Sequence, residues 1–295
     1  MDITIVIVSY NSFDLVKNYI KNLTRKIPIL VIENSRDNNL KNYLEKNYKN
    51  VKVLIPKKNL GYGAGLNLGI KESKTEFVYC STVDVVINNN NFFLLDKYKN
   101  ILRNFGILAG TYHNQRIYKN YEVKDPKIIN KNLLKIGIKE VDVIFGSGFL
   151  LNKKILKEKK ILKLFDENIF LYFEDIDVSL RLRKNNLKLF VSNRVKFQNK
   201  DRRIVNLDYS LKYKLSRNWH YCWSKFYFYK KNYSYIYAVK KIFPNFLRAI
   251  KSLIINLIRI NNSGISISIA QISGILNSIM LKSSFYRIEN KWVKF

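Results

Sequence analysis

The first third of the chain alternates short β-rich runs with segments whose apolar residues recur at helical spacing. Residues 3–8 form an unbroken apolar run, typical of a strand buried on both faces of a parallel sheet. Further strands are predicted at 29–32, 51–55 and 77–80, and helices at 12–23 (with Ser12 as N-cap), 40–48, about 66–71 and 92–102. This rhythm predicts an α/β sheet with crossover helices, and ligands of such sheets bind beyond the carboxyl ends of the strands.

Composition is globular, but the charge is unusual. Of 295 residues, 47% are apolar and 25% charged, which excludes a wholly disordered chain. Lys and Arg number 53 against 22 Asp and Glu, a net charge of +31 that favours polyanionic partners. Two cysteines and two distant histidines exclude a disulfide scaffold and a Cys- or His-rich zinc site. The N-terminus lacks the basic segment of a signal peptide, so we expect a cytoplasmic protein.

The C-terminal region differs from the rest of the chain. Residues 209–288 contain no Asp or Glu but 13 Lys or Arg, and residues 242–258 carry apolar side chains at helical spacing. A basic amphipathic helix bordered by aromatic residues is typical of a membrane interface, although such a helix can also pack on a neighbouring domain. Residues 260–281 are uncharged and long enough to span a bilayer, but their Asn, Gln and Ser residues favour peripheral attachment.

Polar residues follow the predicted strands. Ser9, Tyr10 and Asn11 end the first strand and can hydrogen-bond a ligand in the mouth of the sheet. Glu33 ends the second, where a carboxylate can accept hydrogen bonds from a ribose hydroxyl or a base N–H. The alternative for this second segment is a simple turn with an Asx cap.

A glycine-rich motif occupies residues 59–67, with the sequence Asn-Leu-Gly-Tyr-Gly-Ala-Gly-Leu-Asn. We interpret it as a loop that leads into a helix and whose backbone can approach a ligand closely. The motif is neither G-x-G-x-x-G nor a P-loop, because position 66 is Leu and no Lys-Ser/Thr follows.

Two acidic sites are separated by about ninety residues. Asp84 follows the fourth strand, and Glu174, Asp175 and Asp177 lie together further along the chain. A carboxylate at a strand end suits a divalent cation that holds a diphosphate, and a second one suits a general base. For Asp177 we favour an ion pair with Arg181 at i,i+4.

Taken in order, these motifs resemble the family 2 glycosyltransferases, particularly the bacterial rhamnosyltransferase-like enzymes of cell-surface polysaccharide assembly. The resemblance covers residues 3 to about 198. Its motifs are residues 5–11, 33–35, 59–67, 82–85, 145–151 and 165–177, with weaker matches at 217–218 and 274–277.

The resemblance implies a GT-A fold: residues 1–205 form the catalytic domain, with a mostly parallel central sheet, and residues 206–295 form a helical, membrane-associating region. It further implies a nucleotide-diphosphate-sugar donor, Mg²⁺ or Mn²⁺, inversion at the anomeric carbon, and a lipid-linked glycan or polysaccharide acceptor at the inner membrane face. The residues that it assigns to the donor are Ser9, Tyr10, Asn11, Glu33, Asn59, Gly61, Gly63, Asn67, Thr82 and Asp84.

Asp84 matches the metal-binding end of the DxD motif of that family, and Asp175 matches the catalytic base. Glu174 beside it should raise the pKa of Asp175 toward neutrality. The chain departs from the family pattern at three positions: Thr82 replaces the first Asp of DxD, Glu33 replaces an Asp, and Gln198 stands where many members have His.

Two other functions fit some of these observations. Thr82 and Gln198 would suit a catalytically weakened relative that serves as an assembly scaffold. The charge and the aromatic residues would suit a single-stranded nucleic-acid-binding protein. The basic residues follow a helical apolar stripe rather than a sheet motif, so we do not expect a nucleic-acid partner.

Overall fold

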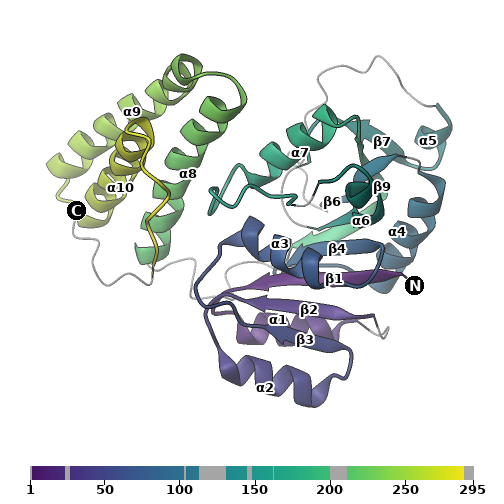
Figure 1. The fold of residues 1–295 in the computed structure, drawn as a ribbon. Coiled ribbons are helices and arrows are strands. Elements are labelled where there is room, and N and C mark those ends of the chain that lie inside the picture. Colours follow the sequence, from purple (N-terminus) through teal and green to yellow (C-terminus); the bar gives the residue numbers. More distant parts are fainter. Residues whose placement is uncertain are drawn as a thin grey trace. The chain divides into compact units, whose positions relative to one another are not determined.

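The computed structural model describes residues 2–23, 27–102, 104–112, 131–144, 148–161, 163–199 and 211–288 (Figure 1). The chain divides into two compact units. The sheet unit holds the described residues of 1–166 and 175–199, and the helical unit holds residues 167–174 and 211–288. The predicted boundary at residue 205 and part of the 145–151 motif lie outside the described residues.

Nine strands among the described residues form the sheet of the first unit, in the order β3-β2-β1-β4-β8-β6-β9-β5, with β7 also paired to β9. They are β1 (Ile3–Ser9), β2 (Ile29–Glu33), β3 (Val51–Leu54), β4 (Phe77–Thr82), β5 (Val85–Val86), β6 (Phe105–Tyr112), β7 (Ile138–Val141), β8 (Phe149–Asn152) and β9 (Lys188–Asn199). Only β5, β7 and β8 of these run antiparallel to their neighbours. The predicted mostly parallel α/β sheet is therefore confirmed.

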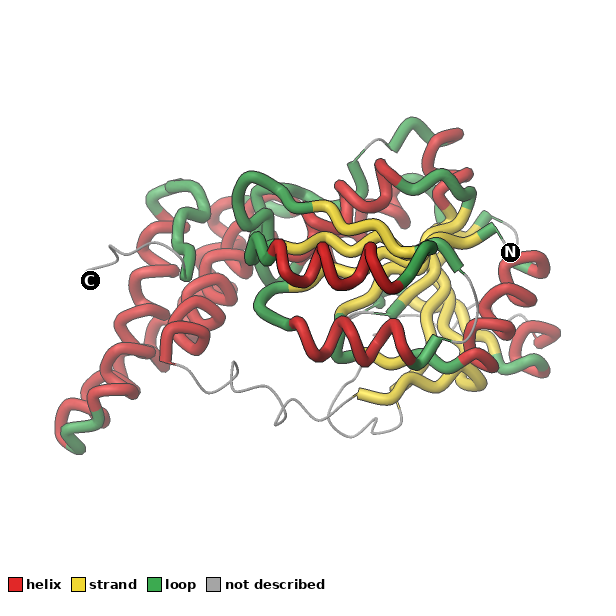
Figure 2. The backbone as a smooth tube through the Cα atoms, turned by 90° about the horizontal axis from the view of Figure 1, so that it is seen from below, coloured by secondary structure: helices red, strands yellow, loops and turns green. Residues whose placement is uncertain are grey.

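Helices cover both faces of the sheet (Figures 1 and 2). They are α1 (Phe13–Lys21), α2 (Asn38–Asn47), α3 (Tyr62–Glu72), α4 (Asn89–Ile101), α5 (Lys131–Lys135), α6 (Lys153–Glu158) and α7 (Glu174–Lys184). Because side chains alternate along a strand, Ile5 and Ile7 of β1 share a core with α1, α2 and α4. Val6, between them, packs with α3, α6 and α7 on the other face. Both faces are thus buried, as the apolar run of β1 predicts.

The motif leads into a helix as predicted, but α3 begins at Tyr62 inside the motif, so the loop is confined to residues 59–61 and the predicted start near residue 66 is too late. Gly61 precedes the helix with a φ of 81°, and Gly63 and Gly65 lie within it. A Cβ atom at Gly69 would lie 2.2 Å from Cγ1 of Val6, and one at Gly65 would lie 3.1 Å from Val8. The glycines therefore let α3 pack closely against β1, and close packing against β1 accounts for part of the motif.

Ser12 is at the predicted N-cap position of α1, and its carbonyl accepts from the backbone N–H of Val16 at 3.0 Å, but its side chain does not cap the helix. The Ser12 side chain makes no cap hydrogen bond with α1 and instead donates to the carbonyl of Tyr10, 2.7 Å away. By contrast, Asp37 caps α2, because its carboxylate accepts from the backbone N–H groups of Asn39 and Leu40.

The helical unit contains α8 (Leu211–Asn232), α9 (Tyr235–Ile258) and α10 (Asn262–Ile279). Its core includes Phe226 of α8, Ile242 of α9 and Ile275 of α10. Gly274 allows close packing of α10 on α8, since a Cβ there would lie 2.5 Å from the carbonyl oxygen of Trp219. Among the described residues, no helix is both long enough and apolar enough to cross a membrane.

Candidate active site

The parallel register brings the carboxyl ends of three strands to one edge of the sheet. Ser9 of β1 lies opposite Glu33 of β2, and Val8 lies opposite Thr82 of β4. The predicted donor-binding residues Ser9, Glu33 and Thr82 therefore meet at the edge where ligands of α/β sheets bind. The half-buried Tyr10 and the exposed Asn11 follow directly after β1.

Glu33 is fully buried, and the protein itself occupies its carboxylate. One oxygen accepts from the hydroxyl of Ser9. The other accepts from the backbone N–H of Ser35, 2.7 Å away, and from its hydroxyl. The backbone N–H of Asn11 in turn donates to the Ser35 hydroxyl at 3.0 Å. The carboxylate thus joins the segments that follow β1 and β2, and it fixes the Ser9 and Ser35 hydroxyls, whose oxygens keep lone pairs.

Asn34 has a structural role at the site that the sequence analysis did not single out. Its buried side chain donates to the carbonyl of Gly61 at 3.1 Å and accepts from the N–H of Leu60 at 3.2 Å. Asn59 completes the turn by accepting from the N–H of Gly61 at 3.0 Å. Asn34 therefore anchors the segment before α3 to the edge of the sheet. The sequence signal for this role is its position directly after β2, between the oxygen-bearing side chains of Glu33 and Ser35.

Asp84 lies in the short turn between β4 and β5. One of its carboxylate oxygens accepts from the hydroxyl of Thr82, the residue that replaces the first Asp of the DxD pattern. Strand β5 pairs with the end of β9, and Val86 lies opposite Gln198 in the register. The position where many family members have His is therefore in the strand adjacent to the Asp84 turn. The side chain of Gln198 lies outside the described part of the structure.

The donor set at this turn fits a divalent cation that is held mainly by its substrate. Among the described residues, no three His, Cys, Asp or Glu side chains form a metal cage. Mg²⁺ commonly takes one or two protein carboxylates and completes its shell with phosphate oxygens and water. A carboxylate has about four lone-pair sites, so Asp84 can accept from Thr82 and still ligate a cation.

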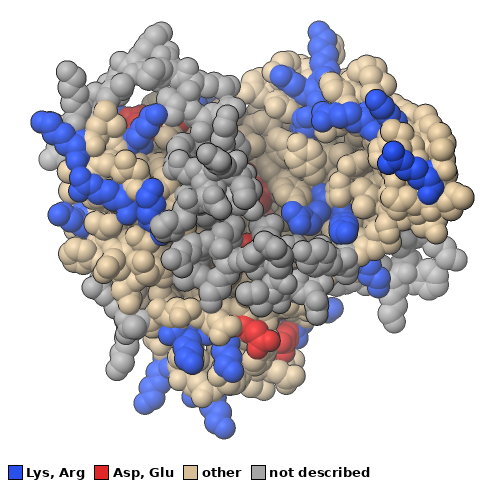
Figure 3. Space-filling view, turned by 180° about the vertical axis from the view of Figure 1, so that it is seen from behind, with Lys and Arg blue, Asp and Glu red and all other residues tan. Residues whose placement is uncertain are grey.

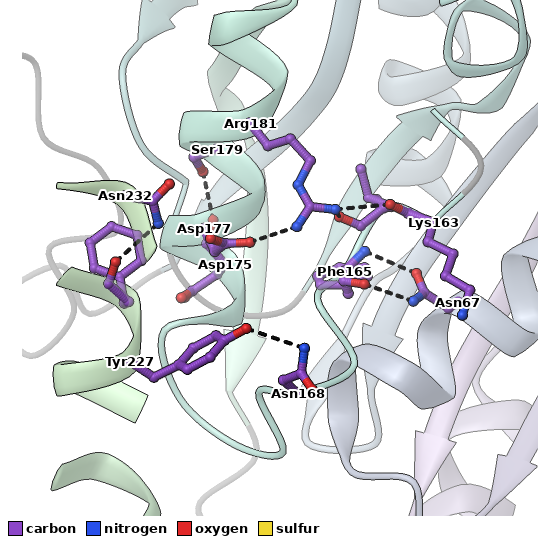
Figure 4. A network of polar contacts seen from close by, with 12 residues as sticks. Asn67, Lys163, Phe165, Asn168, Asp175, Asp177, Ser179, Arg181, Tyr227 and Asn232 are labelled. Carbon is purple, nitrogen blue, oxygen red and sulfur yellow. Dashed lines mark hydrogen bonds and ion pairs between the residues drawn. The ribbon is translucent and has the colours of Figure 1, made fainter. Parts of the chain in front are cut away.

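Two further predicted donor-binding residues lie next to Phe165, and Figure 4 shows one of them, Asn67. The side-chain amide of Asn67 donates to the carbonyl of Phe165 and accepts from its N–H, both at 2.9 Å. A Cβ atom at Gly63 would lie 2.9 Å from Cβ of Phe165. These contacts give both residues a structural role in holding the segment before Asp166, and donor binding by them stays a prediction.

Helix α7 fixes the same segment from its other side (Figure 4). The guanidinium of Arg181 donates to the buried carboxylate of Asp177 at 2.9 Å, so the predicted ion pair is confirmed. It also donates to the carbonyls of Lys163 and Leu164. The Ser179 hydroxyl donates a hydrogen bond to the backbone carbonyl of Asp175, one turn earlier, at 2.8 Å. The first turn of α7 is thereby fixed at the predicted base.

The residues just before α7 belong to the helical unit and have an unusual backbone. Tyr172 and Phe173 both have positive φ angles, 66° and 69°, which cost roughly 1–2 kcal/mol each for non-glycine residues. Helix α8 holds them there. Nε of Arg217 donates to the Tyr172 hydroxyl at 2.7 Å, and the Phe173 ring packs 5.6 Å from that of Phe228. Glu174, the predicted partner of Asp175, is buried; it is the first residue of α7 and the last of residues 167–174 that belong to the helical unit.

Comparison with known proteins agrees with this architecture. The α/β sheet with strand-end polar residues, followed by a helical region, defines a GT-A fold. The family Glycosyl transferase family 2 matches residues 4–159, more than half of the chain. The chain belongs to this family.

The proteins that are similar to this chain include the following curated relative and two solved structures. The low-salt glycan biosynthesis hexosyltransferase Agl10 of Haloferax volcanii is 21% identical over 213 residues, which span 64% of this chain and 64% of the relative. A mannosyltransferase of Pyrobaculum calidifontis, solved with GDP-Man and Mn²⁺, aligns with 95% of this chain and 88% of its own, at 10% identity and a TM-score of 0.56. GalNAc-T7, solved with UDP, GalNAc and Mn²⁺, aligns with 82% of this chain and 56% of its own, at 14% identity and a TM-score of 0.54. At these identities the structures support the fold alone.

Proposed function

We propose that the protein is an inverting glycosyltransferase that moves a hexose, rhamnose-like sugars included, from a nucleotide-diphosphate-sugar to an acceptor hydroxyl. The observation that carries the proposal is the shared edge of β1, β2 and β4, with Asp84 in the turn that follows β4. Membership of the family supports the reaction class. The similar structures, with GDP-Man in one and UDP in the other, support a nucleotide donor.

In this proposal, the chain's own residues bind and orient the donor. The Ser9 and Ser35 hydroxyls, fixed by Glu33, can accept hydrogen bonds from the nucleoside. Asp175 takes the proton of the acceptor hydroxyl. At the same time the hydroxyl oxygen of the acceptor attacks the anomeric carbon, and the bond between that carbon and the diphosphate oxygen breaks. Holding both reactants in one site supplies much of the rate acceleration, because it replaces a bimolecular encounter.

Asp84 would hold a Mg²⁺ or Mn²⁺ ion, with Thr82 orienting its carboxylate. When bound, such an ion neutralises the charge that develops on the leaving diphosphate. The Mn²⁺ in both similar structures supports this assignment. The proposed acceptor is a lipid-linked glycan or polysaccharide of the cell surface.

We also propose that the helical unit attaches the enzyme peripherally to the cytoplasmic face of an anionic membrane. One side of α9 exposes large apolar side chains that follow helical spacing, namely Ile236, Phe243, Leu247, Ile254 and Ile258. The exposed Lys240 and Lys251 lie on the same side, and residues 211–288 contain no acid. Figure 3 shows how Lys and Arg dominate the charged surface. Such a face suits anionic headgroups and the boundary of the acyl chains.

The donor site can be tested by thermal shift with a set of nucleotide-diphosphate-sugars, with and without Mn²⁺. A ligand that binds the native state raises the melting temperature by mass action. We expect at least one sugar nucleotide to raise it only with Mn²⁺, and Asp84→Asn to remove that increment. Glu76→Gln, at an exposed acid paired with Lys154, is the matched control. No metal-dependent shift with any donor would contradict the proposal.

Membrane attachment can be tested by flotation with anionic vesicles. The double variant Phe243→Ser/Leu247→Ser removes two exposed side chains at the centre of the α9 face, and we expect it to abolish co-flotation. Phe93→Ser, at an exposed phenylalanine of α4 in the sheet unit, is the control. Equal flotation of all three proteins would exclude α9 as the attachment surface.

A further inference from the structure

The helical unit contains a pocket that the proposed transfer reaction does not use. It has a volume of about 340 Å³ and is lined by α8, the end of α10 and the segment that follows α10. Three cationic side chains line it, Lys230, Lys282 and Arg287, against one carboxylate, that of the exposed Glu167. A pocket with this excess of positive charge favours an anionic ligand.

The hydrogen bonds of His220 fix the orientation of the Ser284 hydroxyl, which lines the pocket. His220 is buried, and burial, together with the charge of Arg287, lowers its pKa to about 3, so the ring is neutral. Its Nε2 lies 2.9 Å from the carbonyl oxygen of Tyr286, which can only accept. Nε2 therefore carries the proton, and Nδ1 accepts from the hydroxyl of Ser284 at 3.2 Å. Ser284 is thus oriented by the core, whereas Ser283, Lys230 and Lys282 line the pocket with further donor groups.

The pocket wall is preformed. The rings of Trp223 and Tyr227 stack with centroids 5.0 Å apart, and the indole N–H of Trp223 donates to the carbonyl of Lys282 at 3.0 Å. The Arg287 guanidinium lies 3.7 Å above the centre of the Phe170 ring. Asn168 donates to the Tyr227 hydroxyl at 3.2 Å (Figure 4). Because these groups are already held, a ligand would lose little affinity to ordering them.

The cationic pocket adjoins an apolar edge. Leu281 lines the pocket and is 57% exposed, and Met280 beside it in the chain is 56% exposed. A free inorganic anion would leave these side chains in water. A phosphate that is joined to a hydrocarbon chain would cover them, at about 0.8 kcal/mol per buried methylene group.

We propose that this pocket binds the phosphate group of a lipid-linked acceptor, with Lys230 and Lys282 contacting the phosphate and Leu281 contacting the first part of the lipid chain. The inference rests on the proposed function and specifies its acceptor as a phosphate ester on an apolar chain. A phospholipid headgroup has the same chemistry, so the test must separate the two sources.

The probe is farnesyl diphosphate, whose binding is measured by calorimetry on the full chain. Lys230→Gln/Lys282→Gln is compared with the control Lys21→Gln/Lys46→Gln, which removes the same charge from exposed positions of α1 and α2 in the sheet unit. We expect the pocket variant to weaken binding at least about tenfold, because hydrogen bonds to ionised groups are among the strong ones, and the control to bind as the parent does. Inorganic pyrophosphate should bind more weakly than farnesyl diphosphate, and Leu281→Ser should reduce that difference.

Flotation with phosphatidylglycerol vesicles, which contain no diphosphate, separates binding of a lipid-linked acceptor from binding of a phospholipid headgroup. Retained flotation of the pocket variant, together with its weakened farnesyl diphosphate binding, would support the acceptor. Equal weakening by both double variants, or unchanged binding by the pocket variant, would overturn the proposal. Failure here is distinct from failure of the donor site, because the metal-dependent thermal shift with a nucleotide-sugar reports on Asp84 and not on this pocket.

Discussion

The two units of this protein handle charge in opposite ways. In the sheet unit, carboxylates lie at strand and helix ends and are held by hydrogen-bond donors, as Glu33 is by the hydroxyls of Ser9 and Ser35. In the helical unit, residues 211–288 carry no acid, and large apolar side chains of α9 face solvent among lysines. The comparison shows that the sheet unit holds the oriented carboxylates that the proposed catalysis requires. The helices instead present a basic and apolar surface that suits an anionic, apolar partner.

The largest expected effect concerns Asp175 in the sheet unit. Replacing it by Asn removes the proposed proton acceptor with little change in shape, and general-base catalysis is worth about 10²–10⁴-fold in rate. We expect kcat for sugar transfer to fall by that factor while the donor-induced thermal shift is retained. The kcat is measured as release of the nucleoside diphosphate in the presence of acceptor.

Asp142→Asn provides the control, since this acid pairs with Arg183 in the same unit. Turnover of Asp175→Asn within about threefold of the parent would remove Asp175 from the role of base, and chemistry would then have to rely on another group.

The second effect is an acid sensitivity confined to the helical unit. Burial, aided by the charge of Arg287, lowers the pKa of His220 to about 3, and an unfolded histidine titrates near 6.5. Between these values the unfolded chain binds a proton that the native chain does not. Stability should therefore be unaffected above about pH 6.5 and fall by roughly 1.4 kcal/mol per pH unit below it, until about pH 3.

Tryptophan fluorescence is the probe for this effect, because all three tryptophans of the chain follow residue 211. Urea unfolding at pH 7.5 and pH 5 should give midpoints that differ in the parent and differ less in His220→Gln, in which the amide can still donate to Tyr286. The same pH difference in both proteins would assign the acid sensitivity to other groups.

The third effect compares tight packing in the two units. Gly69→Ala would place a methyl group 2.2 Å from Cγ1 of Val6 in the sheet core, and overpacking costs about 1–3 kcal/mol. Gly264→Ala would place one against the end of the Asn256 side chain, which can shift at the expense of its hydrogen bonds with Ser252 and Asn261, so we expect a smaller cost of about 1 kcal/mol. Chemical denaturation followed by circular dichroism measures both, and a larger loss in Gly264→Ala would contradict the comparison.

The smallest effect concerns Asn67. Asn67→Ala removes two hydrogen bonds to Phe165, worth about 1 kcal/mol each when net exchange with water is counted. We expect a small loss of stability with little change in the KM for the donor. A large rise in that KM with unchanged stability would instead support the direct donor contact that the sequence predicts.

The fold could be predicted well because it depends on local patterns. The apolar run of β1 and the alternation of strands and helices are visible residue by residue, and both faces of the sheet follow from them. The glycine motif was harder, because a glycine needed for a loop and one needed where a helix packs on a strand look alike in sequence. Gly65 and Gly69 are of the second kind, since their neighbours are Val8 and Val6 of β1.

The site was predictable in its residue types and less so in their partners. Glu33 ends a strand and Asp84 follows one, as expected. The contacts of Glu33 with Ser9 and Ser35 depend on the pairing register of β1 and β2, which cannot be read from the sequence. Arg181 was expected to pair with Asp177, four residues away on one helix. Its bonds to the carbonyls of Lys163 and Leu164 join segments that are distant along the chain, and no local pattern marks them.

The lack of acids in residues 211–288 has a consequence for how this region responds to its surroundings. Its cations are Lys and Arg, its one histidine is kept neutral, and burial raises the pKa of the Cys222 thiol to about 12. Acidification from about pH 7 to pH 4 meets no carboxylate in this stretch, and its histidine stays neutral, so neither kind of group adds positive charge. The affinity of this region for an anionic membrane should therefore not change on acidification. It should fall with rising ionic strength or with a change in the lipid itself.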